Sequence, residues 1–344
     1  MKWFVRALLG AILALGAGEA LAQTAAISLS IPPTARANAM GEAYCAIADD
    51  ATGAWWNPGG LGFLTKRDAS MTHAQLVPDL ASDVFHDYFS IAFPVKNVGT
   101  FSGSLVYLSY GQSEARDPSG TDLGSFRSYE FSPAITYGVE LAHQVGIGVG
   151  FKYVRVQLSP DFPFLPPGAG TGSTAAFDLG ALWKVPGNRV NVGLALQNLG
   201  PDITFVQPQA GGDPVKDPIY RNLKIGVAGT VYNKNSVGFL LVGDFNQLLV
   251  KGEIVDTSGA VTSRYGKPIW NGGGELSYGA NDVSVALRGG YVQDTDGSIS
   301  DPTYGLGLSY KILRVDFASI PQASDKNTGT SLARVKKFSL SARF

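Results

Sequence analysis

From about residue 68 to the C-terminus, apolar residues alternate with small or polar residues along the chain. A period of two residues is typical of β-strands that bury only one face. The last stretch is the clearest case, because Phe338, Leu340 and Phe344 alternate with serines and basic residues. The pattern predicts an all-β fold for this part of the chain.

The alternation divides into about fourteen strands, each close to the length of about 9–11 residues that a tilted strand needs to cross a bilayer. Val154 and Val156 fall out of phase with the residues before them. We place the strands near residues 68–78, 84–95, 98–110, 126–138, 142–157, 174–185, 188–198, 219–232, 236–247, 268–278, 281–292, 302–311, 312–319 and 334–344.

The connections between these strands alternate in length, apart from a modest first loop. Short connections lie at residues 96–97, 139–141, 186–187, 233–235, 279–280 and after Lys311, and long ones at 111–125, 158–173, 199–218, 248–267, 293–301 and 320–333. Outer-membrane barrels have short periplasmic turns and longer extracellular loops. The chain is therefore expected to form a transmembrane antiparallel up-and-down β-barrel, with the long loops outside the cell.

The composition fits a barrel that is apolar on its outer face only. Charged residues make up 16% of the chain and aromatic residues 11%, and mean hydropathy is +0.07. A soluble domain carries about 25% charged residues, and a helical membrane protein is far more hydrophobic. Outer-membrane lipid is therefore the expected surrounding, and the net charge of −1 gives no reason to expect nucleic acid.

Residues 1–22 have the features of a cleaved signal peptide. Lys2 and Arg6 precede a short apolar run, and small residues at Ala20 and Ala22 provide a cleavage site before Gln23. The apolar run is shorter than the roughly 20 residues of a spanning helix. The protein is therefore expected to be exported to the outer membrane of a Gram-negative type of envelope.

Residues 23–66, the hatch segment, do not alternate. Residues 38–48 are expected to form a short helix with Met40 and Tyr44 on one face. A barrel of about fourteen strands has a lumen too wide for side chains alone to fill, so this segment is expected to lie inside residues 67–344, the barrel. The residues expected to form the hatch are Met40, Gly41, Trp55, Trp56, Asn57, Pro58 and Gly59.

Charged residues inside the strands fall on the face opposite the apolar one. Lys or Arg on the lipid face costs about 2–4 kcal/mol at the middle of the membrane, so these side chains are expected to point into the lumen. There they either pair with one another and with the hatch segment, or line a ligand pathway. The residues are Asp178, Asp244, Glu275, Arg288, Arg314 and Asp316, together with Lys224.

The sequence offers no constellation typical of catalysis. Its three histidines have no metal-ligand spacing, and no Ser or Thr nucleophile is paired with a His base. The glycine run at 146–150 lies inside a strand, where it leaves room for the hatch segment rather than binding a nucleotide. Residues 294–301 lack the Gly and Glu of a calcium loop. We therefore expect neither an enzyme, nor a metal site, nor a cofactor.

The hatch segment resembles that of the PorV/PorQ proteins, a branch of the FadL-like barrels. The resemblance rests on Ala35–Tyr44, Ala48-Asp49-Asp50 and Trp56-Asn57-Pro58-Gly59-Gly60-Leu61. It continues through residues 107–111, 150–153, 196–200 and 338–340. One departure is Gly59, where FadL-like hatches commonly carry Ala. The family implies a 14-stranded barrel with an N-terminal hatch.

The resemblance implies two different functions. PorV-like members act in type IX secretion, where they receive cargo proteins that have crossed the outer membrane and hand them to an attachment complex at the surface; the translocon is a further candidate partner. FadL-like members pass hydrophobic small molecules. For the first function, the exposed loop residues Phe162, Phe164 and Leu165 are candidates for contact with a partner. The closing row of Phe338, Leu340 and Phe344 is a candidate signal for barrel assembly.

Overall fold

The computed structural model describes residues 24–141, 144–162, 166–187, 189–206, 215–255, 261–325, 330–331 and 333–344. The predicted signal peptide lies outside these residues. No helix in the described ranges is long and apolar enough to cross a membrane.

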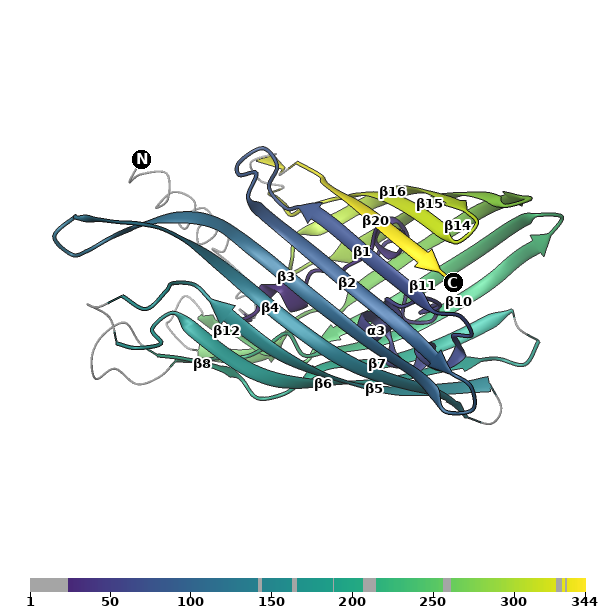
Figure 1. Ribbon diagram of the computed structural model, residues 1–344, viewed down its shortest axis with the longest axis horizontal. Helices are drawn as coiled ribbons and strands as arrows, with labels where there is room; N and C mark the ends of the chain where they lie inside the picture. The colour runs from purple at the N-terminus through teal and green to yellow at the C-terminus, as the bar shows by residue number, and fades with distance from the viewer. Residues whose placement is uncertain are drawn as a thin grey trace.

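Fourteen antiparallel strands close into a barrel, as the sequence predicted, and the last strand pairs with the first (Figure 1). In order around the barrel they are β1 (Asp68–Gln75), β2 (Val84–Val95), β3 (Gly99–Arg116), β4 (Asp122–Leu141), β5 (Val145–Gln157), β6 (Thr171–Lys184), β7 (Val190–Leu199), β10 (Asn222–Lys234), β11 (Val237–Leu248), β14 (Ile269–Ala280), β15 (Val283–Asp294), β16 (Ile299–Tyr310), β17 (Leu313–Ile320) and β20 (Val335–Arg343).

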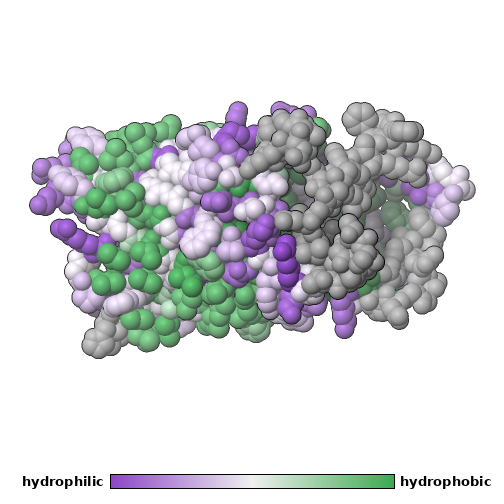
Figure 2. Space-filling model, turned by 180° about the vertical axis from the view of Figure 1, so that it is seen from behind, coloured by the Kyte–Doolittle hydropathy of each residue, from purple (hydrophilic) through white to green (hydrophobic). Residues whose placement is uncertain are grey.

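The alternation of side chains places apolar residues on the outside of the barrel. In β16, Tyr304, Leu306 and Leu308 are more than half exposed, whereas Thr303 is fully buried inside. Figure 2 shows apolar side chains gathered over the outer wall, with hydrophilic side chains beyond them. An exposed apolar belt of this kind is what a lipid bilayer requires of a barrel.

The two ends of the barrel differ in the length of their connections. At the short-turn end, the strands are joined by residues 96–98, 142–144, 185–189, 235–236, 281–282 and 311–312. At the other end, the long-loop end, several segments predicted as loops contain paired strands. Within the described residues, three two-stranded sheets lie there, made of β8 (Ile203–Phe205) with β9 (Val215–Asp217), β12 (Lys251–Val255) with β13 (Val261–Tyr265), and β18 (Ser324–Asp325) with β19 (Thr330–Ser331).

The predicted loop at 111–125 is also mostly strand. Beyond a register shift between Ser109 and Gln112, β3 and β4 continue to pair up to the turn at 117–121. Gly111, with a φ of 85°, allows the bend at this shift. The resulting hairpin projects past the rest of the barrel wall (Figure 1). The predicted loop at 293–301 likewise consists largely of the ends of β15 and β16.

The hatch segment forms four short helical turns inside the barrel. They are η1 (Ile27–Leu29), α2 (Ala35–Ala39), α3 (Gly53–Trp56) and η2 (Pro58–Phe63). The helix predicted over residues 38–48 therefore lies further toward the N-terminus than expected. It cannot continue, because Gly41 and Glu42 take positive φ values of 69° and 65°, a left-handed conformation that ends a helix.

Candidate functional site

The described hatch segment contacts every strand of the barrel. Glycines on the inner wall make these contacts close. A methyl group on Gly148 of β5 would overlap the Pro58 backbone, and one on Gly290 of β15 would overlap Gly41. The segment and the wall therefore meet backbone to backbone. This filled lumen is the candidate functional site.

The Asn-Pro turn ties the hatch segment to strand β6. The Asn57 side chain donates to the carbonyl oxygens of Cys45, at 2.8 Å, and Ala181, at 2.9 Å. It also accepts from the Gly59 N–H at 3.0 Å, which caps η2 with Pro58 in the first position. A methyl group on Gly59 would lie 2.8 Å from the Ala181 Cα atom. The Gly that departs from the family pattern is thus the residue that fits this contact.

The two tryptophans form the apolar centre of the hatch segment. The Trp56 side chain is fully buried, and its ring centroid lies 4.6 Å from that of Trp55 and 5.7 Å from that of Tyr44. The Lys224 ammonium lies 5.4 Å from the Trp56 ring, within the range of a cation–π interaction. Met40 belongs to the same cluster and is fully buried.

The Gly41 turn binds the opposite side of the barrel. Its N–H donates to the Thr303 hydroxyl at 3.0 Å, and that hydroxyl donates to the Ala39 carbonyl oxygen at 3.0 Å. The Asn271 side chain donates to the Gly41 carbonyl oxygen. The two family motifs, Met-Gly and Asn-Pro, thus bind opposing walls of the barrel.

A closed ring of ion pairs and hydrogen bonds joins the hatch segment to the wall at the short-turn end. Arg36 lies 2.7 Å from an Asp49 oxygen and 2.9 Å from a Glu275 oxygen of β14. The Tyr44 hydroxyl lies 2.9 Å from the Asp49 and from the Asp50 carboxylate. On the hatch side of the ring, consecutive contacts therefore connect Glu275 of β14 to Asp50.

The wall side of the ring completes the circuit. Arg314 of β17 lies 3.1 Å from Asp50 and 2.8 Å from Asp316. Arg288 of β15 lies 2.7 Å from Asp316 and 2.6 Å from Glu275. The Arg288 and Asp316 side chains are buried, and removing one partner of such a pair costs about 3–5 kcal/mol. The Asp49 side chain is about half exposed, so solvent screens its ion pair with Arg36 and this pair contributes less.

Burial and charge set the protonation of the hatch residues in this ring. Burial raises the pKa of the Tyr44 hydroxyl well above its usual range, so the hydroxyl keeps its proton and can donate. Burial opposes ionisation of Asp50, but Arg314 and Arg36 outweigh it and hold the pKa of this carboxyl below its usual value. The two arginines therefore favour the charged form of Asp50 against the cost of its burial.

The other two predicted lumen acids also point inward. Asp244 of β11 accepts from the backbone N–H groups of Tyr44 and Cys45, each at 2.9 Å. Asp178 of β6 lies 2.8 Å from Lys152 and accepts from the Asn198 N–H, both on the wall. Six of the seven predicted lumen charges thus contact the hatch segment, directly or through the ring, with Lys224 over the Trp56 ring, and Asp178 is paired within the wall.

The sequence did not point to an anchor near the long-loop end. The Glu130 carboxylate of β4 is fully buried and accepts from the Ile27 N–H at 3.0 Å and the Ser28 N–H at 2.8 Å. The out-of-phase Val154 and Val156 face inward and join an apolar cluster with Ala26, Leu29, Ile203 and Ile219. Strand parity alone would have placed Glu130 on the inner face.

The remaining predicted residues are the candidate loop contacts and the closing row of β20. Phe162 packs edge to face on Phe126, with centroids 5.8 Å apart, while Phe164 and Leu165 lie outside the described residues. Phe338, Leu340 and Phe344 are about half exposed on the outer wall. In the described part of the chain, no three His, Cys, Asp or Glu side chains gather as a metal site would require.

A closed barrel of fourteen strands, with a hatch inside and an apolar belt outside, defines a FadL-like outer-membrane protein. The model of the family "Type IX secretion system protein PorV" matches residues 17–253. The chain therefore belongs to the PorV family of type IX secretion system proteins. No curated protein sequence matches it.

Solved structures share the fold at low sequence identity. A Pseudomonas aeruginosa FadL homologue is 13% identical, covers 91% of this chain and 98% of its own, and has a TM-score of 0.54. The P. putida toluene transporter TodX is 12% identical, covers 90% and 97%, and also has a TM-score of 0.54. The monoaromatic hydrocarbon channel CymD is 12% identical, covers 91% and 97%, and has a TM-score of 0.52.

Proposed function

We propose that this protein is an accessory barrel of type IX secretion, which receives cargo that has crossed the outer membrane and hands it to a surface attachment complex. The observation that carries the proposal is membership of the PorV family over residues 17–253. The hatch segment contacts every strand of the barrel, but the secretion and transport alternatives both include a hatch, so the choice between them rests on the family membership.

The working surface in this proposal is the long-loop end. Short turns face the periplasm and long loops the exterior in barrels of this class, so the β3–β4 hairpin projects from the cell. Phe162 packs on Phe126 of this hairpin, and the other proposed contact residues, Phe164 and Leu165, follow it in the sequence. The partners of the protein in this proposal are the translocon, the attachment complex and the cargo. A cleaved signal peptide at residues 1–22 brings the chain to the membrane.

Passive transport of hydrophobic small molecules was the alternative raised by the sequence. No specific observation favours it. Likeness to the FadL homologue and to TodX at 12–13% identity concerns the fold alone.

Secretion of a reporter in the native host tests the proposal. Deleting the gene should leave a reporter, fused to a type IX C-terminal sorting domain, unattached to the cell surface, and the intact gene should restore attachment. A variant in which residues 112–126 are replaced by a short turn should still insert but should not restore attachment. Inserting Gly-Ser into the short turn at 281–282, at the opposite end of the barrel, provides the matched control and should restore attachment. Normal surface attachment in the deletion strain would refute the secretion role.

A further inference from the structure

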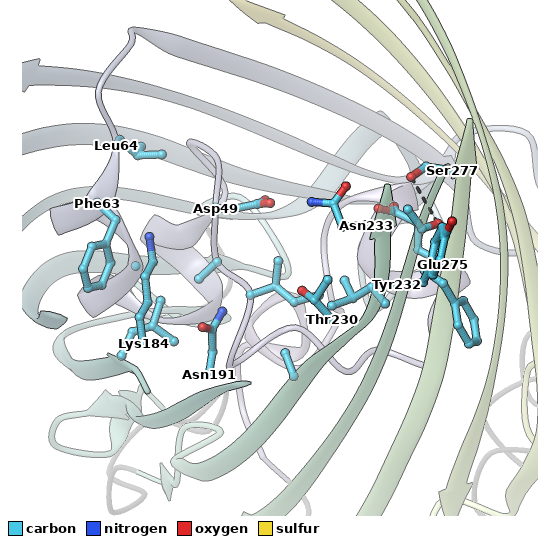
Figure 3. Close-up of a pocket in the computed structure, with 18 residues that line it drawn as sticks. Asp49, Phe63, Leu64, Lys184, Asn191, Thr230, Tyr232, Asn233, Glu275 and Ser277 are labelled. Carbon is cyan, nitrogen blue, oxygen red and sulfur yellow. Dashed lines mark hydrogen bonds between the residues drawn. The ribbon is translucent and has the colours of Figure 1, made fainter. Parts of the chain in front are cut away.

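A cavity of about 370 Å³ lies at the short-turn end, between the hatch segment and the inner wall of β6, β7, β10, β11 and β14 (Figure 3). Ile47, Leu182 and Leu240 give it an apolar wall. Asn191, Thr230, Asn233 and Ser277 add hydrogen-bonding side chains. This volume lies within the usual range of about 300–1,000 Å³ for ligand pockets, and an apolar wall with a few polar groups is typical of them.

The acidic side chains of the cavity form ion pairs, whereas its lysine does not. Its two ring acids, Asp49 and Glu275, both pair with Arg36. Lys184 has no carboxylate within 4.0 Å among the described residues. Its ammonium instead lies 3.9 Å from the centroid of the Phe63 ring, beside which Figure 3 shows it. Lys184 thus has no direct ion pair among the described residues, and the two carboxylates that act on it, Glu140 and Asp49, do so from beyond 4.0 Å.

A second cavity of about 360 Å³ continues from the first, because both are lined by Asn233, Gly238, Glu275 and Ser277. It carries the hydroxyls of three further serines, Ser236, Ser284 and Ser309. Hydroxyl and amide side chains at this density suit the backbone N–H and C=O groups of an extended chain. A fatty or aromatic acid has no such groups to offer.

We propose that the two cavities bind the C-terminal end of an extended polypeptide, with its α-carboxylate on Lys184. The last side chain, an apolar one, packs against Ile47, Leu182 and Leu240, and the preceding backbone lies along the serines. Lys184, which has no direct ion pair among the described residues, offers one positive charge to the single negative charge of an α-carboxylate, whereas a phosphate dianion would bring a second negative charge next to Asp49. The site faces the end of the barrel opposite the proposed secretion surface, so it goes beyond that function and does not depend on it.

Peptide binding to the purified, detergent-solubilised protein tests the site. The probe is a fluorescein-labelled Gly-Ser-Gly-Ser-Gly-Leu peptide, followed by fluorescence anisotropy with either a free or an amidated C-terminus. We expect the free acid to bind, and both amidation and Lys184→Gln to weaken binding about tenfold, which corresponds to one desolvated charge pair of about 1.4 kcal/mol. The matched control is Lys311→Gln, since Lys311 also lies over a ring, Tyr310, at the short-turn end but outside both cavities.

Two further arms identify the occupant. Ala228→Phe fills the first cavity and should abolish binding, while heat-modifiable migration in gels reports that each variant is folded. Octanoate should displace the peptide only weakly. Equal binding of free and amidated peptide, unchanged binding by Lys184→Gln, or no saturable binding at millimolar peptide would each overturn the proposal. Displacement by octanoate as effective as by unlabelled peptide would overturn the polypeptide as occupant.

Discussion

Glycines on the inner wall decide how closely the hatch segment approaches the barrel. Gly290 faces Gly41 with no room for a side chain, whereas its neighbour Gly289 faces outward with nothing within 4 Å of a built Cβ atom. Overpacking costs about 1–3 kcal/mol, so Gly290→Val should unseat the Gly41 turn. We expect a lower temperature of heat modification and a raised conductance in planar bilayers. Gly289→Val is the matched control, and equal behaviour of the two variants would refute the close contact.

At the same scale, Asp50 makes hatch seating sensitive to acid. Because arginines hold its pKa below the usual value in the folded state, the stabilisation is complete above the ordinary carboxyl pKa of about 3.9. It is lost as the pH falls through the lower, folded value. We expect conductance to rise on acidification below about pH 4, and Asp50→Asn to raise it already at neutral pH. Asp117→Asn, in the exposed turn of the β3–β4 hairpin, should behave like the wild type.

At the scale of elements, the hatch segment is the part that closes the lumen. It is held by two motif turns, by the ion-pair ring and by Glu130, on different sides of the wall. Deleting residues 24–63 should leave the barrel closed, since β1 pairs directly with β20. We expect single-channel conductance in planar bilayers to rise well above that of the intact protein. Unchanged conductance of a folded deletion variant would show that something else closes the barrel.

The elements differ in how far the sequence could predict them. The strands could be predicted because alternate residues of each strand face the lipid and the lumen, a pattern visible within the strand itself. The charges that face the lumen could be predicted from the same alternation. The helix over residues 38–48 was misplaced because the left-handed turn at Gly41 and Glu42 is imposed by β14 and β15, which are more than 200 residues away in the chain. The ring through Arg36, Tyr44 and Asp50 likewise depends on tertiary contacts that no local pattern encodes. The projecting hairpin was missed because its polar strands lack the apolar alternation.

At the scale of the whole molecule, the orientation in the membrane follows from which end carries the long loops. We expect a single cysteine at Ser119, in the β3–β4 turn, to react with an impermeant thiol reagent on intact cells. A cysteine at Asn281, in a short turn, should react only after the outer membrane is permeabilised. The native Cys45 is fully buried and gives little background. The reverse pattern of labelling would invert the topology and move the proposed secretion surface to the periplasm.

Assembly of the whole barrel is expected to start from the last strand. Phe344 is about half exposed on the outer wall, and its N–H donates to the Arg67 carbonyl oxygen at 2.9 Å where β20 meets β1. Before closure, β20 is an open edge that the insertion machinery can pair with, and the Phe338, Leu340 and Phe344 row adds selectivity.

Phe344→Asp should therefore leave unassembled protein in the periplasm. Tyr310→Asp is matched in exposure (54% against 52%) and lies at the same end of the barrel, yet it should assemble, because it interrupts no terminal signal. If both variants give heat-modifiable barrel in the outer membrane, Phe344 is one more lipid-facing aromatic; if neither does, the defect is the charge in the membrane belt.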